Sequence, residues 1–441
     1  MHRFMCVAWQ ILVFVLAGCA QTRPEAGAGW TQRTNSPEHA GKPRVVLVSL
    51  DGFRWDFPDR FETPALRRLG ESGARAERLV PSFPTVTFSN HYSIATGLRP
   101  GRHGIVGNRF VDREQGRGYS FRDRADVEDG SWYGGEPIWV TAENQGMTTA
   151  AYFFVGTEAA VTGIQPTRWH RFSVEIPAAE RVDAALAWLA EPEPTRPHLV
   201  LLYFGDVDAV GHIHGIQAPE TAAAVRKVDA LIDRLMRGIA ALPDGDNVYL
   251  VVVSDHGLRD IRQDTPPFIV DEAVDLALTD MVAGGSYMLL YLADPASARS
   301  ARDRINAAWG TGRAYLPTDT PPAWQTSDNP RFGDLILVAD PGYLVIPQTR
   351  AGMPVDAAGH GWAPEDTAMH GILMMAGPGI PAGTRLPAVD NVDLYPLLAR
   401  MLGLRPAEGL DADRAAFEGL PATWTPPSAG RAAESPLEAR P

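Results

Sequence analysis

Short apolar runs alternate with amphipathic segments along most of this chain, and this alternation constrains the fold most strongly. Buried strands are predicted at 44–52, 148–156, 198–206, 247–257 and 370–379, with helices at 63–73, 178–190 and 221–242. Continuous apolar strands separated by helices are typical of a mostly parallel sheet that is covered on both faces. We therefore predict an α/β domain over residues 44–405, with helices on both faces of a central sheet.

A second pattern interrupts this alternation between about residues 262 and 352. It contains strand-like runs at 286–294 and 334–345 and a helix-like run at 297–309. These runs predict a small α+β insertion that packs beside the main sheet. Such an insertion either roofs a site or decorates an edge of the sheet, and we favour partial roofing.

The N-terminus has the pattern of a targeting segment. An apolar stretch from about Val7 to Ala17, too short to span a bilayer, ends in Leu-Ala-Gly-Cys at Cys19. This ending resembles a bacterial lipobox, which predicts a lipoprotein signal peptide at 1–18 and lipidation of Cys19. An ordinary cleaved signal with an incidental cysteine is the alternative. Because the other cysteine, Cys6, lies inside the signal, the mature chain has no internal disulfide.

The segments that flank the domain lack periodicity. Residues 19–43 are rich in Gly, Pro and Ala and predict a flexible tether, and residues 406–441 predict a C-terminal extension that is disordered from about 422. The resemblance to a lipobox, with Ala20 rather than an aspartate after Cys19, implies a place in the bacterial cell envelope. We expect a lipid anchor in the outer membrane, with the domain facing the periplasm.

The charge of the chain limits its partners. The formal net charge is -13, which argues against a nucleic-acid duplex as the partner. Metal cations in a site would still allow an acidic protein to bind phosphate. The charge therefore does not exclude phosphate chemistry.

Acidic and histidine residues follow several of the predicted strands. Since chemistry in parallel sheets gathers at the carboxyl ends of the strands, we expect these residues to meet at one edge, although a single aspartate after a strand is usually a turn former. Three aspartates, three histidines and one hydroxyl group suit two zinc-like cations. The candidate residues are Asp51, Asp208, His212, Asp255, His256 and His360. Gly211 would allow a bend that brings Asp208 and His212 to one ion.

A loop of unusual composition, PSFPTVTFSNHY at 81–92, carries Thr87. A threonine hydroxyl is a poor nucleophile at neutral pH, and no G-x-S-x-G elbow is present. Coordination to a metal cation is the activation route that remains. We therefore predict that Thr87 attacks phosphorus, while the next backbone N–H and an asparagine amide hold a phosphate oxygen.

Five segments carry a resemblance to a known family, in its order and with similar spacing. They are FPTVTFSNHYSIATGLRPGRHGIVGN (83–108), VSLDGFR (48–54), DVDAVGH (206–212), SDHG (254–257) and GHGW (359–362). The chain resembles a nucleotide pyrophosphatase/phosphodiesterase of the alkaline phosphatase superfamily, over roughly residues 44–405. The resemblance implies an alkaline phosphatase-like fold.

The resemblance also implies roles for single residues. Thr87 takes the place of the family's nucleophile, and Asn108 that of its phosphate-oxygen donor. Phe88 and Tyr203 match aromatics that sandwich a base, although Tyr203 could equally be a core strand residue. The first metal would bind Asp208, His212 and His360, and the second Asp51, Asp255, His256 and Thr87. Asn90 and His91 would fix the loop, Asp206 would orient a ligand, and His214 and His370 would lie outside the metal set.

The implied activity is hydrolysis of phosphodiester or pyrophosphate bonds of nucleotides or related small molecules, through a phosphothreonine and with two zinc ions or similar divalent cations. A related threonine enzyme for choline-type phosphodiesters or phosphonates is the alternative, and a non-catalytic binding protein is a second one. A sulfatase lacks support because no C-x-P-x-R occurs. The sequence alone places none of Arg54, Arg99, Arg102 and Arg109 in the site, which favours diesters over monoesters. The stretch 154–157 departs from the family pattern and leaves substrate choice open.

Overall fold

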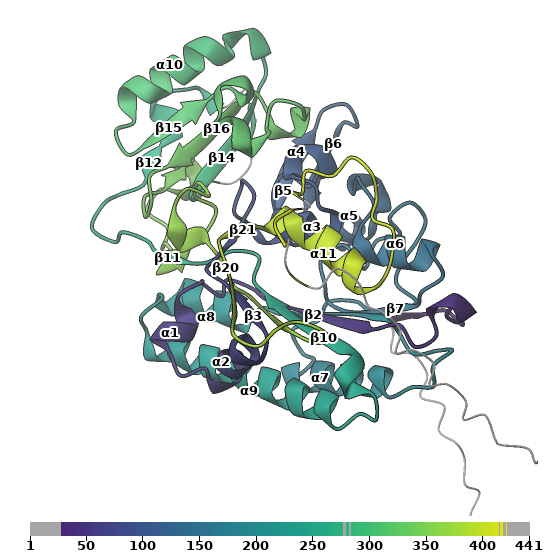
Figure 1. The fold of residues 1–441 in the computed structure, drawn as a ribbon. Coiled ribbons are helices and arrows are strands. Elements are labelled where there is room, and N and C mark those ends of the chain that lie inside the picture. Colours follow the sequence, from purple (N-terminus) through teal and green to yellow (C-terminus); the bar gives the residue numbers. More distant parts are fainter. Residues whose placement is uncertain (1–27, 277–278, 282–283, 414, 418–419, 421–441) are drawn as a thin grey trace, which may run out of the picture.

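The computed structural model describes residues 28–276, 279–281, 284–413, 415–417 and 420, and a large twisted sheet lies at its centre (Figure 1). Within these residues the sheet has nine strands. Their order across the sheet is β1 (Ala28–Trp30), β8 (Arg168–His170), β7 (Thr149–Tyr152), β9 (Leu199–Phe204), β2 (Arg44–Leu50), β10 (Val248–Val253), β19 (Leu373–Ala376), β3 (Ala74–Ala76) and β20 (Thr384–Leu386).

Helices cover both faces of this sheet, as the apolar strands require. One face carries α2 (Pro64–Ser72), α7 (Ala178–Leu189) and α9 (Pro219–Ala240), and the other carries α3 (Thr87–Thr96), α6 (Ile138–Asn144) and α11 (Leu394–Met401). Because side chains alternate along a strand, Val46 and Val48 of β2 join the core under the first set, and Val45 and Leu47 join the core under the second. The predicted α/β fold with helices on both faces is confirmed.

The sheet is mostly parallel, as predicted. Strands β8, β7, β9, β2 and β10 run in one direction, and β1 and β19 run against their neighbours. The prediction of a strand at 370–379 did not say whether this strand runs parallel or antiparallel to its neighbours. The chain reaches β19 from His360, which lies at the carboxyl edge of the parallel strands, so β19 starts from that edge and must run the opposite way.

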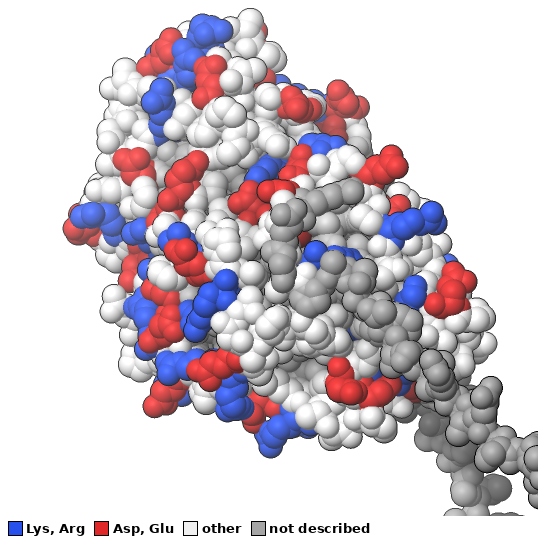
Figure 2. All heavy atoms as spheres, viewed as in Figure 1, with Lys and Arg blue, Asp and Glu red and all other residues white. Residues whose placement is uncertain are grey.

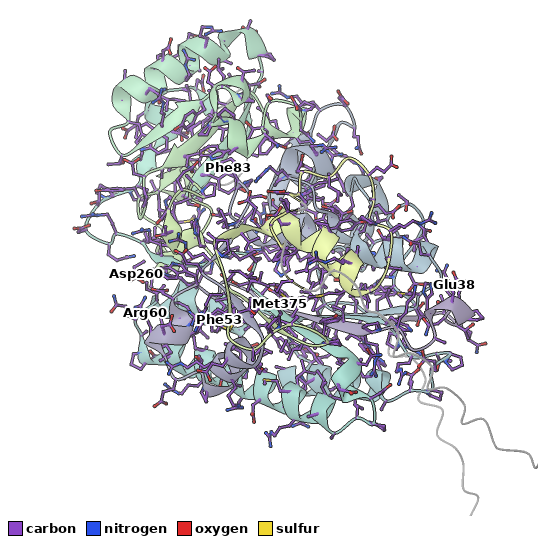
Figure 3. All side chains as sticks on the ribbon, viewed as in Figure 1. Glu38, Phe53, Arg60, Phe83, Asp260 and Met375 are labelled. Atoms are coloured by element: carbon purple, nitrogen blue, oxygen red, sulfur yellow. The ribbon has the colours of Figure 1, made fainter. Side chains whose placement is uncertain are left out.

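The insertion forms a unit of its own on one side of the main domain (Figure 1). Its sheet has the order β13 (Thr279–Met281), β14 (Tyr287–Leu292), β16 (Leu335–Ala339) and β15 (Gly312–Tyr315), with α10 (Ala298–Ala308) against it. Phe83, at the boundary with this unit in Figure 3, stacks on Trp324 at 3.9 Å between ring centroids and meets Tyr287 edge-on. The unit therefore packs against the segment that leads to Thr87.

The prediction of a flexible tether is wrong for residues 28–43. Strand β1 pairs with β8, and Asn35 donates from its side chain to the carbonyls of Glu193 and Arg196. His39 is buried, with Nε2 2.5 Å from the carbonyl of Gln145. Polar contacts rather than apolar periodicity hold this segment, which is why its composition resembled a linker. Residues 19–27, with Cys19, lie outside the described residues.

The described part of the C-terminal extension packs on the domain. Asp411 donates its backbone N–H to the carbonyl of Gly97, Ala407 donates to the hydroxyl of Tyr395, and Phe417 is buried. The predicted disorder from about residue 422 lies outside the described residues. Among the described residues, no helix is both long and apolar enough to cross a membrane.

The face seen in Figure 2 carries acidic and basic side chains side by side, without a broad area of one sign. Many charged side chains of the described residues form ion pairs, such as Arg234 with Asp183. This face offers no basic stripe of the kind that binds a nucleic-acid backbone.

Candidate active site

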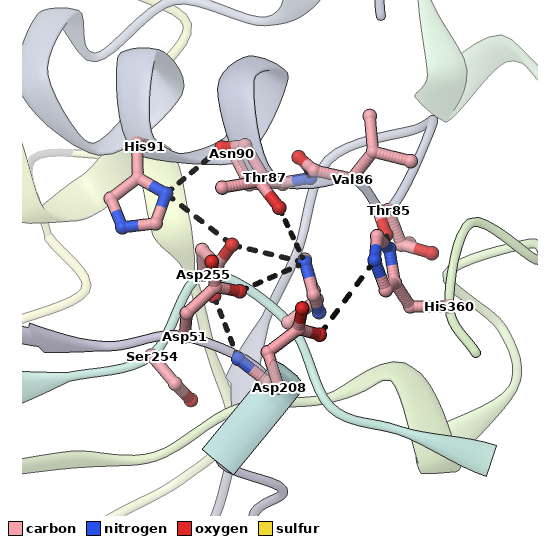
Figure 4. A network of polar contacts seen from close by, with 12 residues as sticks. Asp51, Thr85, Val86, Thr87, Asn90, His91, Asp208, Ser254, Asp255 and His360 are labelled. Carbon is pink, nitrogen blue, oxygen red and sulfur yellow. Dashed lines mark hydrogen bonds and ion pairs between the residues drawn. The ribbon is translucent and has the colours of Figure 1, made fainter. Parts of the chain in front are cut away.

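The six predicted acidic and histidine residues meet at the carboxyl edge of the sheet, directly beside Thr87. Figure 4 shows four of them, Asp51, Asp208, Asp255 and His360, close to Thr87. They come from four separate segments of the chain. Asp51 follows β2, Asp208 and His212 lie in α8 (Asp206–His214), Asp255 and His256 follow β10, and His360 follows β18 (Ala358–Gly359). The parallel strands that end at this edge bring them together.

Asp208, His212 and His360 form the first group. Asp208 Oδ1 lies 3.5 Å from His212 Nε2 and 3.8 Å from His360 Nε2. The expected bend at Gly211 is wrong, because α8 is a continuous helix through this residue. Residues four apart share one face of a helix, so the helix itself aims Asp208 and His212 at one point.

His256 joins the second group to its aspartates. His256 Nε2 lies 3.4 Å from Asp51 Oδ1 and 3.0 Å from Asp255 Oδ2. Asp255 Oδ1 accepts the backbone N–H of Gly52 at 3.2 Å. The two groups adjoin, because the His256 and His360 rings stack at 3.7 Å between centroids.

The donor atoms of the cluster fit divalent cations. Candidate ligand atoms lie within 4.8 Å of one another in the set Asp208, His212 and His360 and again in the set Asp51, Asp208 and His256. Asp51 Oδ1, Asp208 Oδ1 and Asp255 Oδ2 are buried without a hydrogen-bond partner among the described residues. A buried carboxylate oxygen without a donor is costly unless a cation neutralises it, so the structure suits two ions of the kind that carboxylate and imidazole bind together.

The pKa shifts show that the cluster is short of positive charge. Burial and the charges of Asp255 and Asp208 raise the pKa of Asp51 well above its usual value. Burial and the charge of His256 lower the pKa of His360 to about 3, so its imidazole stays neutral and able to act as a ligand. Burial opposes charge on His212, but its hydrogen bond and charge interaction with Asp208, and then Asp356, raise its pKa to about 9. Bound cations would reverse the raised pKa values of Asp51 and His212, because they would supply the missing positive charge.

All three histidines turn the same ring nitrogen toward the cluster. His256 Nδ1 lies 3.0 Å from the carbonyl of Gly257, and His360 Nδ1 lies 3.0 Å from the carbonyl of Thr85. His212 Nδ1 lies 3.1 Å from Asp356 Oδ2. The acceptor beside each Nδ1 favours a proton there and turns each Nε2 toward the cluster. His212, whose pKa is raised to about 9, would give up its Nε2 proton when a cation binds.

Thr87 is the first residue of α3, so the expected loop ends at Val86 and the expectation is wrong for residues 87–92. Its Oγ1 lies 3.3 Å from His256 Nε2. The N-cap residue, Val86, gives the helix start no side-chain cap hydrogen bond, and nearly the whole of α3 is buried. Packing thus outweighs the poor helix propensity of this mixture of residues.

A buried polar network holds the start of α3. Asn90 donates to the carbonyls of Pro84 and Val86, and its Oδ1 accepts from the backbone of Ser82. Asn391, 301 residues away, donates to the same Oδ1 at 2.9 Å. His91 Nδ1 lies 2.9 Å from the carbonyl of Thr87 and 3.3 Å from Asp255 Oδ2. Asn90 and His91 therefore fix this segment, as predicted.

A cavity of about 640 Å³ opens beside Thr87 and reaches Asp51, Asp208, His212 and His360. Asn108 lies in its wall, and Asn108 Oδ1 accepts the backbone N–H of Phe88 at 3.0 Å. Aromatic and aliphatic side chains form much of the remaining lining. They are Phe88, Phe121, Val127, Phe153, Val155, Phe172 and Tyr203. Val155 belongs to the stretch that departs from the family pattern.

Tyr203 has a second contact that the sequence did not predict. It lines the cavity, and its hydroxyl donates to Asp51 Oδ2 at 2.5 Å. Burial and the charge of Asp51 raise the pKa of Tyr203 well above its usual value, so the hydroxyl keeps its proton. Tyr203 thus orients Asp51, a candidate metal ligand, independently of any contact that its ring makes with a substrate.

Other residues weighed from the sequence lie elsewhere. Asp206 pairs with Lys227 at 2.5 Å instead of orienting a ligand. His214 is exposed at the end of α8, and His370 Nε2 lies 2.7 Å from the carbonyl of Pro364.

Of the four arginines near the motifs, three are paired with aspartates outside the cavity. Arg54 pairs with Asp56, Arg99 with Asp390 and Arg102 with Asp411. Arg109 is the exception and lies next to Asn108.

Sequence reasoning missed three residues that support the site. Thr85 holds His360 through its carbonyl and Gly361 through its hydroxyl. Asp356 contacts His212, and Asn391 contacts Asn90. Thr85 lies two residues before Thr87, which was a usable signal, whereas Asp356 and Asn391 gave none.

Comparisons with known proteins identify a family for this chain. The family model described as type I phosphodiesterase/nucleotide pyrophosphatase matches residues 45–372. The mouse ectonucleotide pyrophosphatase/phosphodiesterase family member 1 is 29% identical over 387 residues, covering 84% of this chain but only 42% of its own length. An uncharacterised pyrophosphatase/phosphodiesterase of Schizosaccharomyces pombe is 29% identical over 402 residues, covering 86% of this chain and 80% of its own.

Solved structures give the same fold. Mouse ectonucleotide pyrophosphatase/phosphodiesterase 5 aligns with a TM-score of 0.80 at 24% identity, over 86% of this chain and 99% of that one. The same mouse protein has also been solved as an inactive threonine-to-alanine variant in complex with AMP. The chain belongs to the type I phosphodiesterase/nucleotide pyrophosphatase family, within the alkaline phosphatase superfamily.

Proposed function

We propose that the protein hydrolyses phosphodiester or pyrophosphate bonds of nucleotides or related small molecules, with Thr87 as the nucleophile and two divalent cations, zinc by preference. The observation that carries this proposal is the position of Thr87 Oγ1 beside a cluster of three aspartates and three histidines, of which Asp51, Asp255 and His256 are buried. The names of the relatives support the reaction class. The inactive threonine variant of the mouse structure, in complex with AMP, supports a catalytic threonine and a nucleotide substrate.

The resemblance to the family gives the two ligand sets, and the contacts of Asp208 with His212 and His360 and of His256 with Asp51 and Asp255 support them. Asp208, His212 and His360 would hold one ion, and Asp51, Asp255, His256 and Thr87 would hold the other. Bound at these places, the two ions would lower the pKa of a coordinated hydroxyl and stabilise negative charge on a departing oxygen. Aspartate and histidine together favour zinc over calcium or magnesium.

The residues of the chain supply the rest of the reaction. Thr87 Oγ forms a bond to phosphorus as the bond to the leaving oxygen breaks, and water then cleaves the phosphothreonine and restores the hydroxyl. Because Asn108 Oδ1 already accepts from Phe88, its amide Nδ2 is the end left to donate to a phosphate oxygen. The start of α3 places backbone N–H groups and the positive end of the helix dipole beside the same oxygen.

The aromatic wall favours a flat group on the substrate. Phe88 and Tyr203 lie on this wall, and aromatic faces bind bases by stacking. A choline ester has no flat group to stack, although aromatic faces also attract cations. A nucleotide is therefore the substrate class that the cavity supports best.

A substrate panel on purified, metal-analysed protein tests the proposal. It should include the 4-nitrophenyl ester of thymidine monophosphate, ATP, dinucleotides, cyclic dinucleotides and choline phosphodiesters. We expect turnover of the nucleotide compounds, loss of turnover after chelation, and recovery with zinc. Cleavage of the choline esters alone, or full activity in the chelated protein, would contradict the proposal.

We also propose that Cys19 carries a lipid that anchors the domain in the outer membrane, facing the periplasm. The sequence around Cys19 supports this, and that segment lies outside the described residues. Labelling of expressing bacteria with a clickable fatty acid tests it. Label on the wild type and none on Cys19→Ser is expected, and equal labelling would refute the anchor.

A further inference from the structure

The exposed large hydrophobic side chains of the described residues gather around the candidate active site. They are Phe172, Val174, Ile213 and Met353, which are 43%, 83%, 69% and 57% exposed. Phe172 lines the cavity of the site, and Ile213 follows His212, which also lines it. Met353 lines a second hollow that shares Asn108 with that cavity. We call these four side chains the apolar rim.

The rim is built from three segments that are distant in the chain. Phe172 and Val174 follow β8, Ile213 lies near the end of α8, and Met353 lies in the loop after η10 (Gln348–Arg350). This loop leads to Asp356, which contacts His212. Single exposed hydrophobic residues are normally scattered over a protein surface, whereas an exposed apolar group around a site marks a surface that meets an apolar partner.

The start of the described chain lies at the same edge of the sheet as the site. Ala28 of β1 pairs with His170 of β8, and His170 is opposite Tyr152 of the parallel strand β7. His170 is the last residue of β8. Ala28 therefore lies at the carboxyl edge, beside the residue that comes two positions before Phe172.

The length of chain before Ala28 limits which face of the domain can reach a membrane. Residues 19–27 are nine residues, which span at most about 30 Å. A domain of this size has a diameter of roughly 50 Å. An anchor at Cys19 would therefore hold the carboxyl edge near the bilayer, and it is too short to let the opposite edge face the bilayer.

We infer that the apolar rim docks on the phospholipid bilayer that carries the anchor, an inference that rests on the lipid anchor proposed for Cys19. Side chains of this kind bind at the boundary between head groups and acyl chains. The short chain before Ala28 is the reason to choose a bilayer over a protein partner. The cavity would then open toward the membrane surface, and substrate would reach it from there.

Hydrogen–deuterium exchange of the full mature chain tests this inference. Cys19, the one cysteine of the mature chain, can be coupled to a maleimide phospholipid in phosphatidylcholine vesicles. The comparison is the same protein with Cys19 capped, mixed with plain vesicles. Coupling should slow the exchange of backbone amides at 173–176 and 351–355 at least about 10-fold. Exchange at 244–247, at the opposite edge of the sheet, should not change.

Variants identify the rim as the cause of the slower exchange. Val174→Asp combined with Met353→Asp should restore fast exchange in the coupled protein, because a charge resists burial in a bilayer. Ala187→Asp, a matched change at an exposed residue of α7 outside the rim, should leave the slow exchange in place. Equal exchange in coupled and capped wild-type protein would overturn the inference, and so would slow exchange that persists in the double variant.

This test depends neither on turnover nor on lipidation in the cell. If fatty-acid labelling shows no lipid on Cys19 while the coupled protein is protected, the proposed anchor fails and the affinity of the rim for a bilayer stands. If Cys19 is labelled while the rim of the coupled protein exchanges as fast as in the capped protein, only the docking of the rim fails.

Discussion

Tyr203 donates its hydroxyl proton to Asp51 across 2.5 Å, and the same ring forms part of the cavity wall. One side chain thus joins the surface that would meet a substrate to a carboxylate that would hold a metal. The resemblance to the family gave Tyr203 a substrate role alone.

Substitution separates these two roles. Tyr203→Phe keeps the ring and removes the hydrogen bond, so zinc affinity should fall about 10-fold to 100-fold while KM for the nitrophenyl ester stays within about 2-fold. Tyr203→Leu should raise KM as well. Competition with a chromogenic chelator measures the affinity. Unchanged zinc binding in Tyr203→Phe would show that the contact to Asp51 does not matter.

Asp356 is predicted to hold the ring of His212. Removing its carboxylate in Asp356→Ala leaves Nδ1 without its partner at 3.1 Å, and zinc affinity should fall about 10-fold to 100-fold. Asp356→Asn keeps an acceptor oxygen and should retain most of the affinity. Asp246→Ala, an exposed aspartate at the other end of the sheet, is the control. This role would be contradicted if zinc affinity fell about 10-fold to 100-fold in Asp356→Asn and did not fall in Asp356→Ala.

Asn391 is predicted to position the nucleophile through Asn90. Asn391→Ala should lower the free energy of unfolding by about 1–3 kcal/mol, since buried polar groups lose a partner. It should also lower kcat with KM and zinc content unchanged. Asn391→Asp, of the same shape, sets an oxygen against Asn90 Oδ1 and should lower kcat at least as much. If Asn391→Ala lost stability but kept the wild-type kcat, the role of Asn391 would be structural only.

The fold and the cluster of aspartates and histidines could be predicted from the sequence because both rest on local patterns. The run before Asp51 is continuous and apolar, which marks a strand buried on both faces, and Asp51 follows it directly. The four-residue spacing of Asp208 and His212 already predicted that both side chains reach one ion. The prediction attributed this to a bend, whereas the structure has a helical turn.

The features that could not be predicted from the sequence depend on contacts between segments that are distant in the chain. Thr87 starts a helix only because α3 is buried among other elements, and local propensity cannot show that. Asp356 lies 144 residues from His212 and is a single exposed aspartate in a loop. Residues 28–43 resemble a linker in composition, yet Asn35 binds carbonyls more than 150 residues away.

The buried histidine His103 predicts acid sensitivity. Burial lowers its pKa to about 3, and it lies 3.0 Å from Ser93 Oγ without charge. The unfolded chain binds a proton near pH 6.5 and the folded chain does not, so stability is complete above that pH and falls as the pH drops toward 3. From pH 7.5 to pH 5 this one group should cost about 2 kcal/mol.

Urea unfolding of the chelated protein at several pH values measures this loss. His103→Gln cannot titrate, so its stability should fall less steeply between pH 7.5 and pH 5 than that of the wild type. The same slope in both proteins would show that His103 is protonated in the folded state or contributes nothing to the acid response.

The most direct measurement is turnover of the nitrophenyl ester by Thr87→Ala, with zinc content determined on the same sample. Loss of the nucleophile should lower kcat at least about 1,000-fold, while both zinc ions remain, and Thr87→Ser should recover part of the rate. Turnover within about 2-fold of the wild type in zinc-loaded Thr87→Ala would show that the reaction does not pass through this hydroxyl.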